Sequence, residues 1–170
     1  MEPIDIETIE EADRFAFGLN TEQVNEWRED YEVKHSYFLG LINSSYSYLG
    51  NTTNDDDLYR LLFVMVISFE RSFQSLPEII DEDYYLCVNK WEAEYKKERR
   101  SLSPNYKIKL LTSRHGQPNL AKYLNGKLNQ NNDGWNKYPG TFKYIPVFNL
   151  MIYCDVMNTA IEKLLSPPTE

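Results

Sequence analysis

Residues 58–69, LYRLLFVMVISF, form a stretch that is apolar almost all the way round a helix, interrupted only by Arg60 and Ser68. A helix with no polar face must be surrounded by other parts of the protein, because none of its sides can face water. Three aspartates at 55–57 precede it and complement the positive end of a helix dipole. We therefore expect a central helix at about residues 55–76.

Helical patterns continue on both sides of this stretch. The turn NTEQ at 20–23 has the spacing of a capping box, with Asn20 as the N-cap and Gln23 three residues later. The further helices that periodicity, glycine and proline predict cover residues 6–17, 21 to about 49, 78 to before Pro104, 118–126, and from near Pro146 to Pro167. In the second of these, the apolar stripe includes Val24, Trp27, Tyr31 and His35.

The sequence therefore predicts an all-α protein, a single-domain bundle spanning residues 1–170. We expect about five or six helices around the central one, with little or no β structure. The hexapeptide YKIKLL at 106–111 alternates like a strand but has no evident partner strand. Trp135, in a turn-rich loop, is expected to anchor that loop.

Composition fits an ordinary folded domain. The chain has 170 residues, of which 42% are hydrophobic and 14% aromatic, which argues against disorder. Its longest apolar run is far shorter than the roughly 20 residues that a membrane span needs, and the first residues lack a basic segment before an apolar one. We expect a soluble, cytoplasmic protein in which Cys87 and Cys154 are buried free thiols.

Few residues suggest catalysis. The sequence has no glycine-rich phosphate loop, no nucleophile elbow and no cluster of metal ligands around its two histidines. Arg28 and His35, with six residues between them in REDYEVKH, resemble the Arg-x(4–6)-His pattern of the HEPN ribonucleases. That resemblance covers these two positions and the all-α class, and it implies an RNA-cleaving dimer. His35 also lies on an apolar stripe, so we expect no enzyme and no cofactor and keep the ribonuclease as an alternative.

Charge is divided along the chain, within a total of −8. Residues 1–32 carry 11 acidic and two basic side chains, residues 33–89 carry eight and three, and residues 90–170 carry seven and 13. Like charges gathered on one surface repel one another, and a common use for them is to attract a partner of opposite charge. A plain solvated acidic face is the simpler explanation.

The leading hypothesis is an acidic inhibitor of a basic protein, best exemplified by an immunity protein that occludes the active cleft of a nuclease-type bacterial toxin. Carboxylates would stand where the toxin expects phosphates, and aromatic side chains would anchor the contact. The residues that we expect to bind the partner are Glu10, Glu11, Glu22, Glu26, Glu29, Asp30 and Tyr31.

A basic strip at residues 96–127 offers a third possibility. It holds nine lysines and arginines against Glu98 alone, with Tyr106 and Tyr123 between them. Such a strip could follow a nucleic-acid backbone, or it could lie against the acidic helices within one chain or across a homodimer. Because the whole chain is acidic, we do not expect nucleic acid to be the main partner.

The ribonuclease and inhibitor hypotheses predict different behaviour of one double variant. Replacing Arg28 and His35 with alanine should abolish RNA cleavage if the pair is catalytic, and should leave partner binding largely intact if the chain is an inhibitor. A ribonuclease assay on the purified protein, with the unmodified chain beside it, measures the difference.

Overall fold

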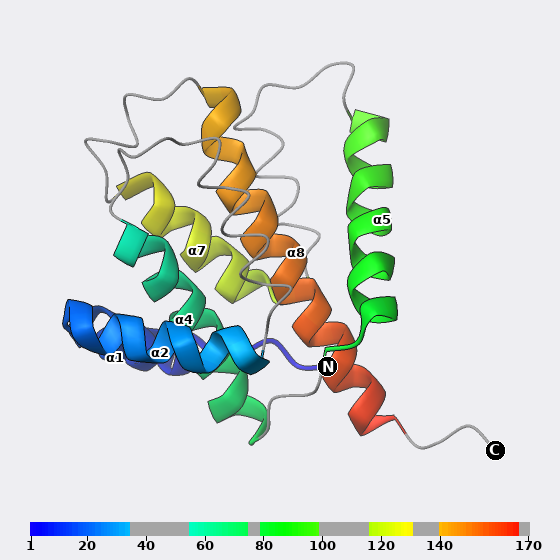
Figure 1. The fold of residues 1–170 in the computed structure, drawn as a ribbon. Coiled ribbons are helices and arrows are strands. Elements are labelled where there is room, and N and C mark those ends of the chain that lie inside the picture. The colour runs from blue at the N-terminus through cyan, green and yellow to red at the C-terminus, as the bar shows by residue number, and fades with distance from the viewer. Residues whose placement is uncertain (35–54, 75–78, 99–115, 131–139, 167–170) are drawn as a thin grey trace.

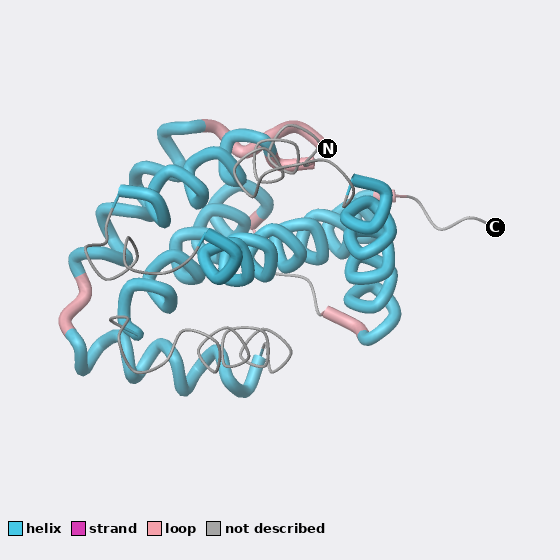
Figure 2. Tube along the Cα trace, turned by 90° about the horizontal axis from the view of Figure 1, so that it is seen from above, coloured by secondary structure: helices cyan, strands magenta, loops and turns pink. Residues whose placement is uncertain are grey.

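The computed structural model describes residues 1–34, 55–74, 79–98, 116–130 and 140–166. These residues are helical apart from short connections, and none of them forms a strand (Figures 1 and 2). The helices are α1 (Ile6–Gly18), α2 (Thr21–Lys34), α4 (Asp55–Phe73), α5 (Asp81–Glu98), α7 (Pro118–Gln130) and α8 (Gly140–Leu165). The all-α class is confirmed. The expected extension of α2 to residue 49, the strand-like 106–111 and the loop around Trp135 lie outside the described residues.

Helix α4 is buried as its sequence requires. Every residue from Leu61 to Phe69 is at most 4% exposed, and α1, α2 and α8 pack around it. It begins at Asp55 as expected but ends at Phe73 rather than near residue 76. The reason is Gln74, which has a φ of 59° and donates its backbone N–H to the Glu70 carbonyl at 2.8 Å. A left-handed residue of this kind closes a helix.

Helix α8 is a second buried helix, which the sequence analysis did not single out. Residues Leu150 to Asn158 are at most 6% exposed, and α4, α5 and α7 all contact α8 (Figure 1). It begins at Gly140, so the expected start near Pro146 is wrong. Proline is favoured in the first turn of a helix, where its missing N–H costs nothing, and for that reason Pro146 predicted a helix start. The helix instead continues through it.

Two other boundaries differ from expectation. Helix α7 begins at Pro118 as predicted but continues past Asn125 and Gly126 to Gln130, because Gly126 remains helical. Helix α5 begins at Asp81 rather than at residue 78, and its Cys87 and Trp91 lie inward, each 2% exposed.

The helical periodicity of residues 6–17 and of the helix after residue 78 predicts that Ile6 and Ile80 face inward, but both are exposed. Ile80 is 45% exposed and Ile6 is 61% exposed. Both stand at the start of a helix, Ile6 as the first residue of α1 and Ile80 just before α5. The periodic pattern counts such a residue as inward although fewer neighbouring turns surround it.

Helix α5 is held on α8 by buried acids as well as by apolar contacts. Asp155, 3% exposed, accepts hydrogen bonds from Lys90 Nζ at 2.7 Å and from Trp91 Nε1 at 3.0 Å. Asp83, 2% exposed, pairs with Lys163 of α8. Buried carboxylates need such partners, because an isolated charge inside a protein is strongly unfavourable.

The two polar residues within the apolar stretch each have a structural role. Arg60 Nη1 donates to the backbone carbonyls of Ala16 and Leu19, both at 2.7 Å. These carbonyls lie at the C-terminal end of α1, where helical carbonyls lack partners within the helix. Ser68 Oγ donates to the Val64 carbonyl of its own helix at 2.6 Å. Arg60 therefore caps α1 from the side of α4.

Replacing Arg60 with alanine should lower the free energy of unfolding by about 1–3 kcal/mol, since it removes two hydrogen bonds from a charged donor. Urea denaturation followed by circular dichroism measures the change. Arg14→Ala is the matched control, because Arg14 is exposed on α1 and its loss should change stability by less than about 0.5 kcal/mol. Equal stability of the two variants would contradict the capping role of Arg60.

Candidate protein-binding surface

Helix α2 begins with the capping box that the sequence predicts. Asn20 Oδ1 accepts the backbone N–H of Gln23 at 2.9 Å, and Gln23 Oε1 accepts the backbone N–H of Asn20 at 2.9 Å. Both contacts satisfy N–H groups that have no partner within the helix. The cap fixes where α2 starts and therefore which of its residues face the core.

The inner face of α2 is aromatic and packs on α4. Val24 is 1% exposed and Tyr31 8% exposed. The rings of Trp27 and Tyr31 lie 5.5 Å and 5.7 Å from the ring of Phe63, centroid to centroid. Aromatic clusters of this spacing bury a large apolar area and favour defined ring geometry. This side of α2 therefore packs into the core.

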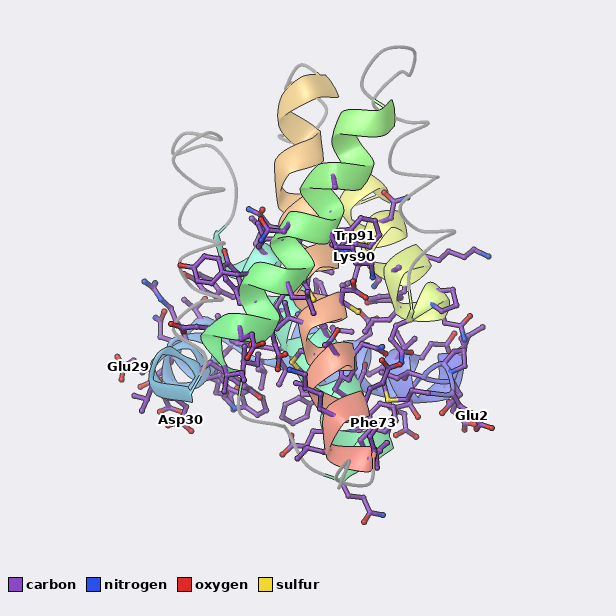
Figure 3. All side chains as sticks on the ribbon, turned by 90° about the vertical axis from the view of Figure 1, so that its right-hand side faces the viewer. Glu2, Glu29, Asp30, Phe73, Lys90 and Trp91 are labelled. Carbon is purple, nitrogen blue, oxygen red and sulfur yellow. The ribbon has the colours of Figure 1, made fainter. Side chains whose placement is uncertain are left out.

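The outer face of α2 is acidic. Its exposed carboxylates belong to Glu22, Glu26, Glu29 and Asp30, which we call the α2 acidic surface. Positions 22, 26 and 29 follow a spacing of four and three residues, so they form one row along the helix. Glu29 and Asp30 point outward on one side of the molecule (Figure 3). Within the described parts of the chain, none of the four carboxylates forms an ion pair.

The two α1 glutamates of the expected site differ from the α2 acids in their surroundings. The Glu11 carboxylate lies 2.9 Å from Arg71 Nη1 on α4, so the protein's own arginine offsets its charge. The Glu10 side chain is exposed and lines a groove between α1 and α7. The seven residues predicted as one site are thus not one surface.

Tyr31 does not belong to the α2 acidic surface. At 8% exposed it is a core residue, and burial, together with the nearby charges of Glu70 and Asp30, raises the pKa of its hydroxyl. The sequence analysis placed Tyr31 both on the apolar stripe with Val24 and Trp27 and among the partner-binding residues, and the structure agrees with the stripe.

The sequence analysis missed an exposed aromatic residue next to α2. Phe15 of α1 is 41% exposed, and its ring centroid lies 5.3 Å from that of Trp27. Phe15 lies outside the helical spacing of Ile6, Ile9 and Ala16, so an aromatic residue off the apolar stripe was the signal that the sequence offered. An exposed aromatic ring beside a charged row is typical of surfaces that bind other proteins.

The residues of the ribonuclease alternative do not form a described site. The guanidinium of Arg28 lies over the ring of Tyr59, 5.0 Å from its centroid, in a cation–π contact with α4. His35 lies outside the described residues. In the residues that the structure describes, no three histidine, cysteine, aspartate or glutamate side chains come together as metal ligands could.

The described part of the basic strip is partly used inside the molecule. Lys127 Nζ lies 3.0 Å from the carboxylate of Asp13, which also accepts a hydrogen bond from the Tyr123 hydroxyl. Lys122 is exposed. Residues 99–115, which contain much of the strip, lie outside the described chain. The pair of Asp13 and Lys127 agrees with the expectation that the basic strip lies against the acidic N-terminal helices.

The two cysteines are buried and not joined to each other, as predicted. Cys87 Sγ lies 3.6 Å from Thr159 Oγ1 at the contact of α5 with α8. Burial raises the pKa of the Cys87 thiol and raises that of Cys154 well above its ordinary value. Since the thiolate is the nucleophile, both groups are poor candidates for covalent chemistry.

Comparisons with known proteins leave the function to be argued from the surface. No protein family matches the sequence, and no curated protein or solved structure is similar enough to count as a match. Among the described helices, none is both long and apolar enough to cross a membrane.

The raised thiol pKa values predict slow modification of the folded protein. At mildly alkaline pH, a disulfide reagent such as Ellman's should react with Cys87 and Cys154 at least about tenfold more slowly than in the denatured chain, because a higher pKa leaves less thiolate. Cys87 should react before the more deeply buried Cys154. Rapid labelling of either thiol in the folded protein would contradict the burial described here.

Proposed function

We propose that this chain is a protein-binding inhibitor that captures a basic partner through the α2 acidic surface. The observation that carries the proposal is that Glu22, Glu26, Glu29 and Asp30 are all exposed, while Glu11 and Asp13 of α1 are paired with the protein's own cations. Four neighbouring carboxylates repel one another and slightly destabilise the fold. A basic partner would remove that repulsion on binding.

The best concrete case is an immunity protein that neutralises a nuclease-type bacterial toxin in the cytoplasm. The active cleft of a nuclease is basic because it must hold a phosphate backbone. A row of carboxylates can occupy the same positions as phosphates and accept hydrogen bonds from the same lysines and arginines. Charge-assisted attraction also speeds encounter, by roughly 10–10³-fold for strongly complementary surfaces. Fast association benefits such an inhibitor, because it must bind the toxin before the toxin cleaves its substrate.

The aromatic pair at the edge of the surface supports the proposal. Charges at a rim mainly control the rate of association, whereas buried aromatic anchors contribute most of the affinity. Phe15 is 41% exposed beside Trp27, and it can be covered by a partner without leaving its own helix. The side chain of Val33, 86% exposed near the end of the acidic row, adds apolar area at the opposite end.

A charge-reversal variant tests the proposal. Changing Glu26, Glu29 and Asp30 to lysine should slow association with the basic protein that the chain captures by at least about tenfold at low ionic strength, because it removes the steering field. The variant's association rate should also lose its dependence on salt. Stopped-flow measurement over a range of salt concentrations gives both quantities.

The matched control reverses three exposed acids elsewhere, Glu2, Glu7 and Glu82, and so changes the net charge by the same amount. Glu2 points outward far from Glu29 and Asp30 (Figure 3). This control should retain most of the association rate and its salt dependence. If both triple variants slow association equally, net charge rather than the α2 acidic surface governs binding, and the proposal is wrong at these positions.

A further inference from the structure

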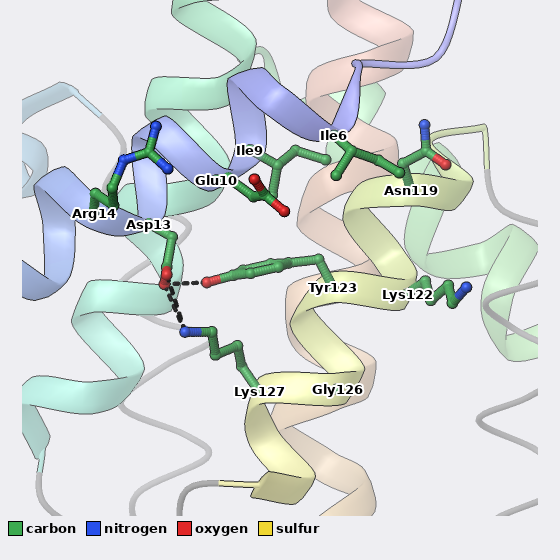
Figure 4. A pocket seen from close by; sticks show the side chains of 10 residues that line it. All are labelled: Ile6, Ile9, Glu10, Asp13, Arg14, Asn119, Lys122, Tyr123, Gly126 and Lys127. Carbon is green, nitrogen blue, oxygen red and sulfur yellow. Dashed lines mark hydrogen bonds and ion pairs between the residues drawn. The ribbon is translucent and has the colours of Figure 1, made fainter.

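A groove of about 540 Å³ runs between α1 and α7 (Figure 4). Its volume lies within the range of sites that hold small ligands or single side chains of a partner. Helix α1 contributes Ile6, Ile9, Glu10, Asp13 and Arg14, and α7 contributes Asn119, Lys122, Tyr123, Gly126 and Lys127. None of these residues belongs to the α2 acidic surface.

One end of the groove is closed by a satisfied polar cluster. The carboxylate of Asp13 accepts hydrogen bonds from the Tyr123 hydroxyl and from Lys127 Nζ, the latter at 3.0 Å. Burial and the hydrogen bond to Asp13 raise the pKa of Tyr123, so its hydroxyl remains a donor. The Lys127 ammonium also lies 5.6 Å from the centroid of the Tyr123 ring. These contacts hold the Tyr123 ring in place across the groove.

Glu10 is the acidic side chain of the groove that lies outside the Asp13 cluster. Its carboxylate is directed from α1 toward the Tyr123 ring, whereas the charged ends of Arg14 and Lys122 are directed away to either side (Figure 4). Among the described residues, Glu10 forms no ion pair. Its negative charge therefore faces the groove without a paired cation of its own, whereas Lys127 on α7 is paired with Asp13.

The remaining lining includes an aliphatic wall on α1 and a bare stretch of α7. Ile9 is 2% exposed, and Ile6 beside it is 61% exposed, so an aliphatic wall opens to solvent. A methyl group added at Gly126 would have no atom within 4 Å, so α7 leaves open space there. A chain of methylene groups can lie along such a wall without displacing any side chain.

From these features we infer that the α1–α7 groove binds an aliphatic amine or guanidinium of the lysine or arginine type. The cationic head lies between the Glu10 carboxylate and the face of the Tyr123 ring, and the aliphatic stem lies along Ile6 and Ile9. Both partners favour the cation, because a carboxylate gives a charge-assisted hydrogen bond and an aromatic face attracts positive charge. This inference does not rest on the proposed function.

The probes are chosen to separate charge from shape. Agmatine, a guanidinium on a four-carbon stem, represents a free ligand, and a short peptide with a single arginine and blocked ends represents a protein side chain. Hexanoate has a similar stem with the opposite charge. Titrations of the full chain are followed by ¹H–¹⁵N NMR, with calorimetry for affinity. Agmatine should shift the amide signals of Glu10, Tyr123 and Gly126, and hexanoate should not.

Variants of the groove give a second, independent readout. Glu10→Gln keeps the size of the side chain and should weaken agmatine binding about tenfold, because the charge-assisted contact is lost. Gly126→Trp should fill the groove and abolish binding. Gly126→Ala, the matched control, should retain binding and be slightly more stable, since alanine is the better helix former.

The direction in which two further variants change the affinity for agmatine shows whether the groove favours a cation or an anion. Arg14→Gln and Lys122→Gln each remove a positive charge near the groove and should tighten agmatine binding by about twofold. Weaker agmatine binding in these variants, unchanged binding in Glu10→Gln, or preferential binding of hexanoate would overturn the inference. If agmatine binds and the arginine peptide does not, the ligand is a free amine rather than a protein side chain. The triple lysine variant of α2 should bind agmatine normally, which separates this result from the proposed function.

Discussion

The pair of hydrogen bonds from Arg60 to the end of α1 determines how the N-terminal half is assembled. A helix as apolar as α4 can carry a cation only where that cation has partners, and the carbonyls of Ala16 and Leu19 provide them at 2.7 Å each. The same contact sets the position of α1 on α4, and α1 in turn forms one wall of the groove with α7. It also sets Phe15 against Trp27 of α2. The exposed aromatic edge therefore depends in part on the half-buried charge of Arg60.

Much of the fold followed from local sequence chemistry. The apolar stretch 58–69 predicted the buried helix, and Asn20 with Gln23 predicted the start of α2, because both signals act within a few residues. The boundaries at Pro146 and Gly126 failed for the same physical reason. Both residue types favour helix ends, since in a helix interior glycine costs about 1 kcal/mol and proline about 3 kcal/mol relative to alanine, and only tertiary packing can override that local preference.

The candidate surfaces divide in a similar way. The row at 22, 26 and 29 could be read from spacing alone, but the pairing of Glu11 with Arg71 joins residues 60 positions apart and has no local signal. The groove depends on contacts such as Tyr123 with Asp13, which are 110 positions apart. Charge totals by segment treated the acids of α1 and α2 as one group. Only the three-dimensional structure separates the acidic side chains that pair with the protein's own cations from those that remain exposed to water.

The attachment of α5 has a consequence for how the molecule opens. Among the described residues, the buried apolar side chains between α5 and α8 form a small cluster of Cys87, Trp91, Ile152 and Val156, separate from the main core. The pairs that Asp83 and Asp155 form with lysines support this contact. Detaching α5 would expose little of the main core, so its local unfolding requires less free energy than global unfolding. Helices α1, α2 and α4 would keep their mutual packing throughout. The molecule can therefore lose one helix transiently while its N-terminal surfaces stay intact.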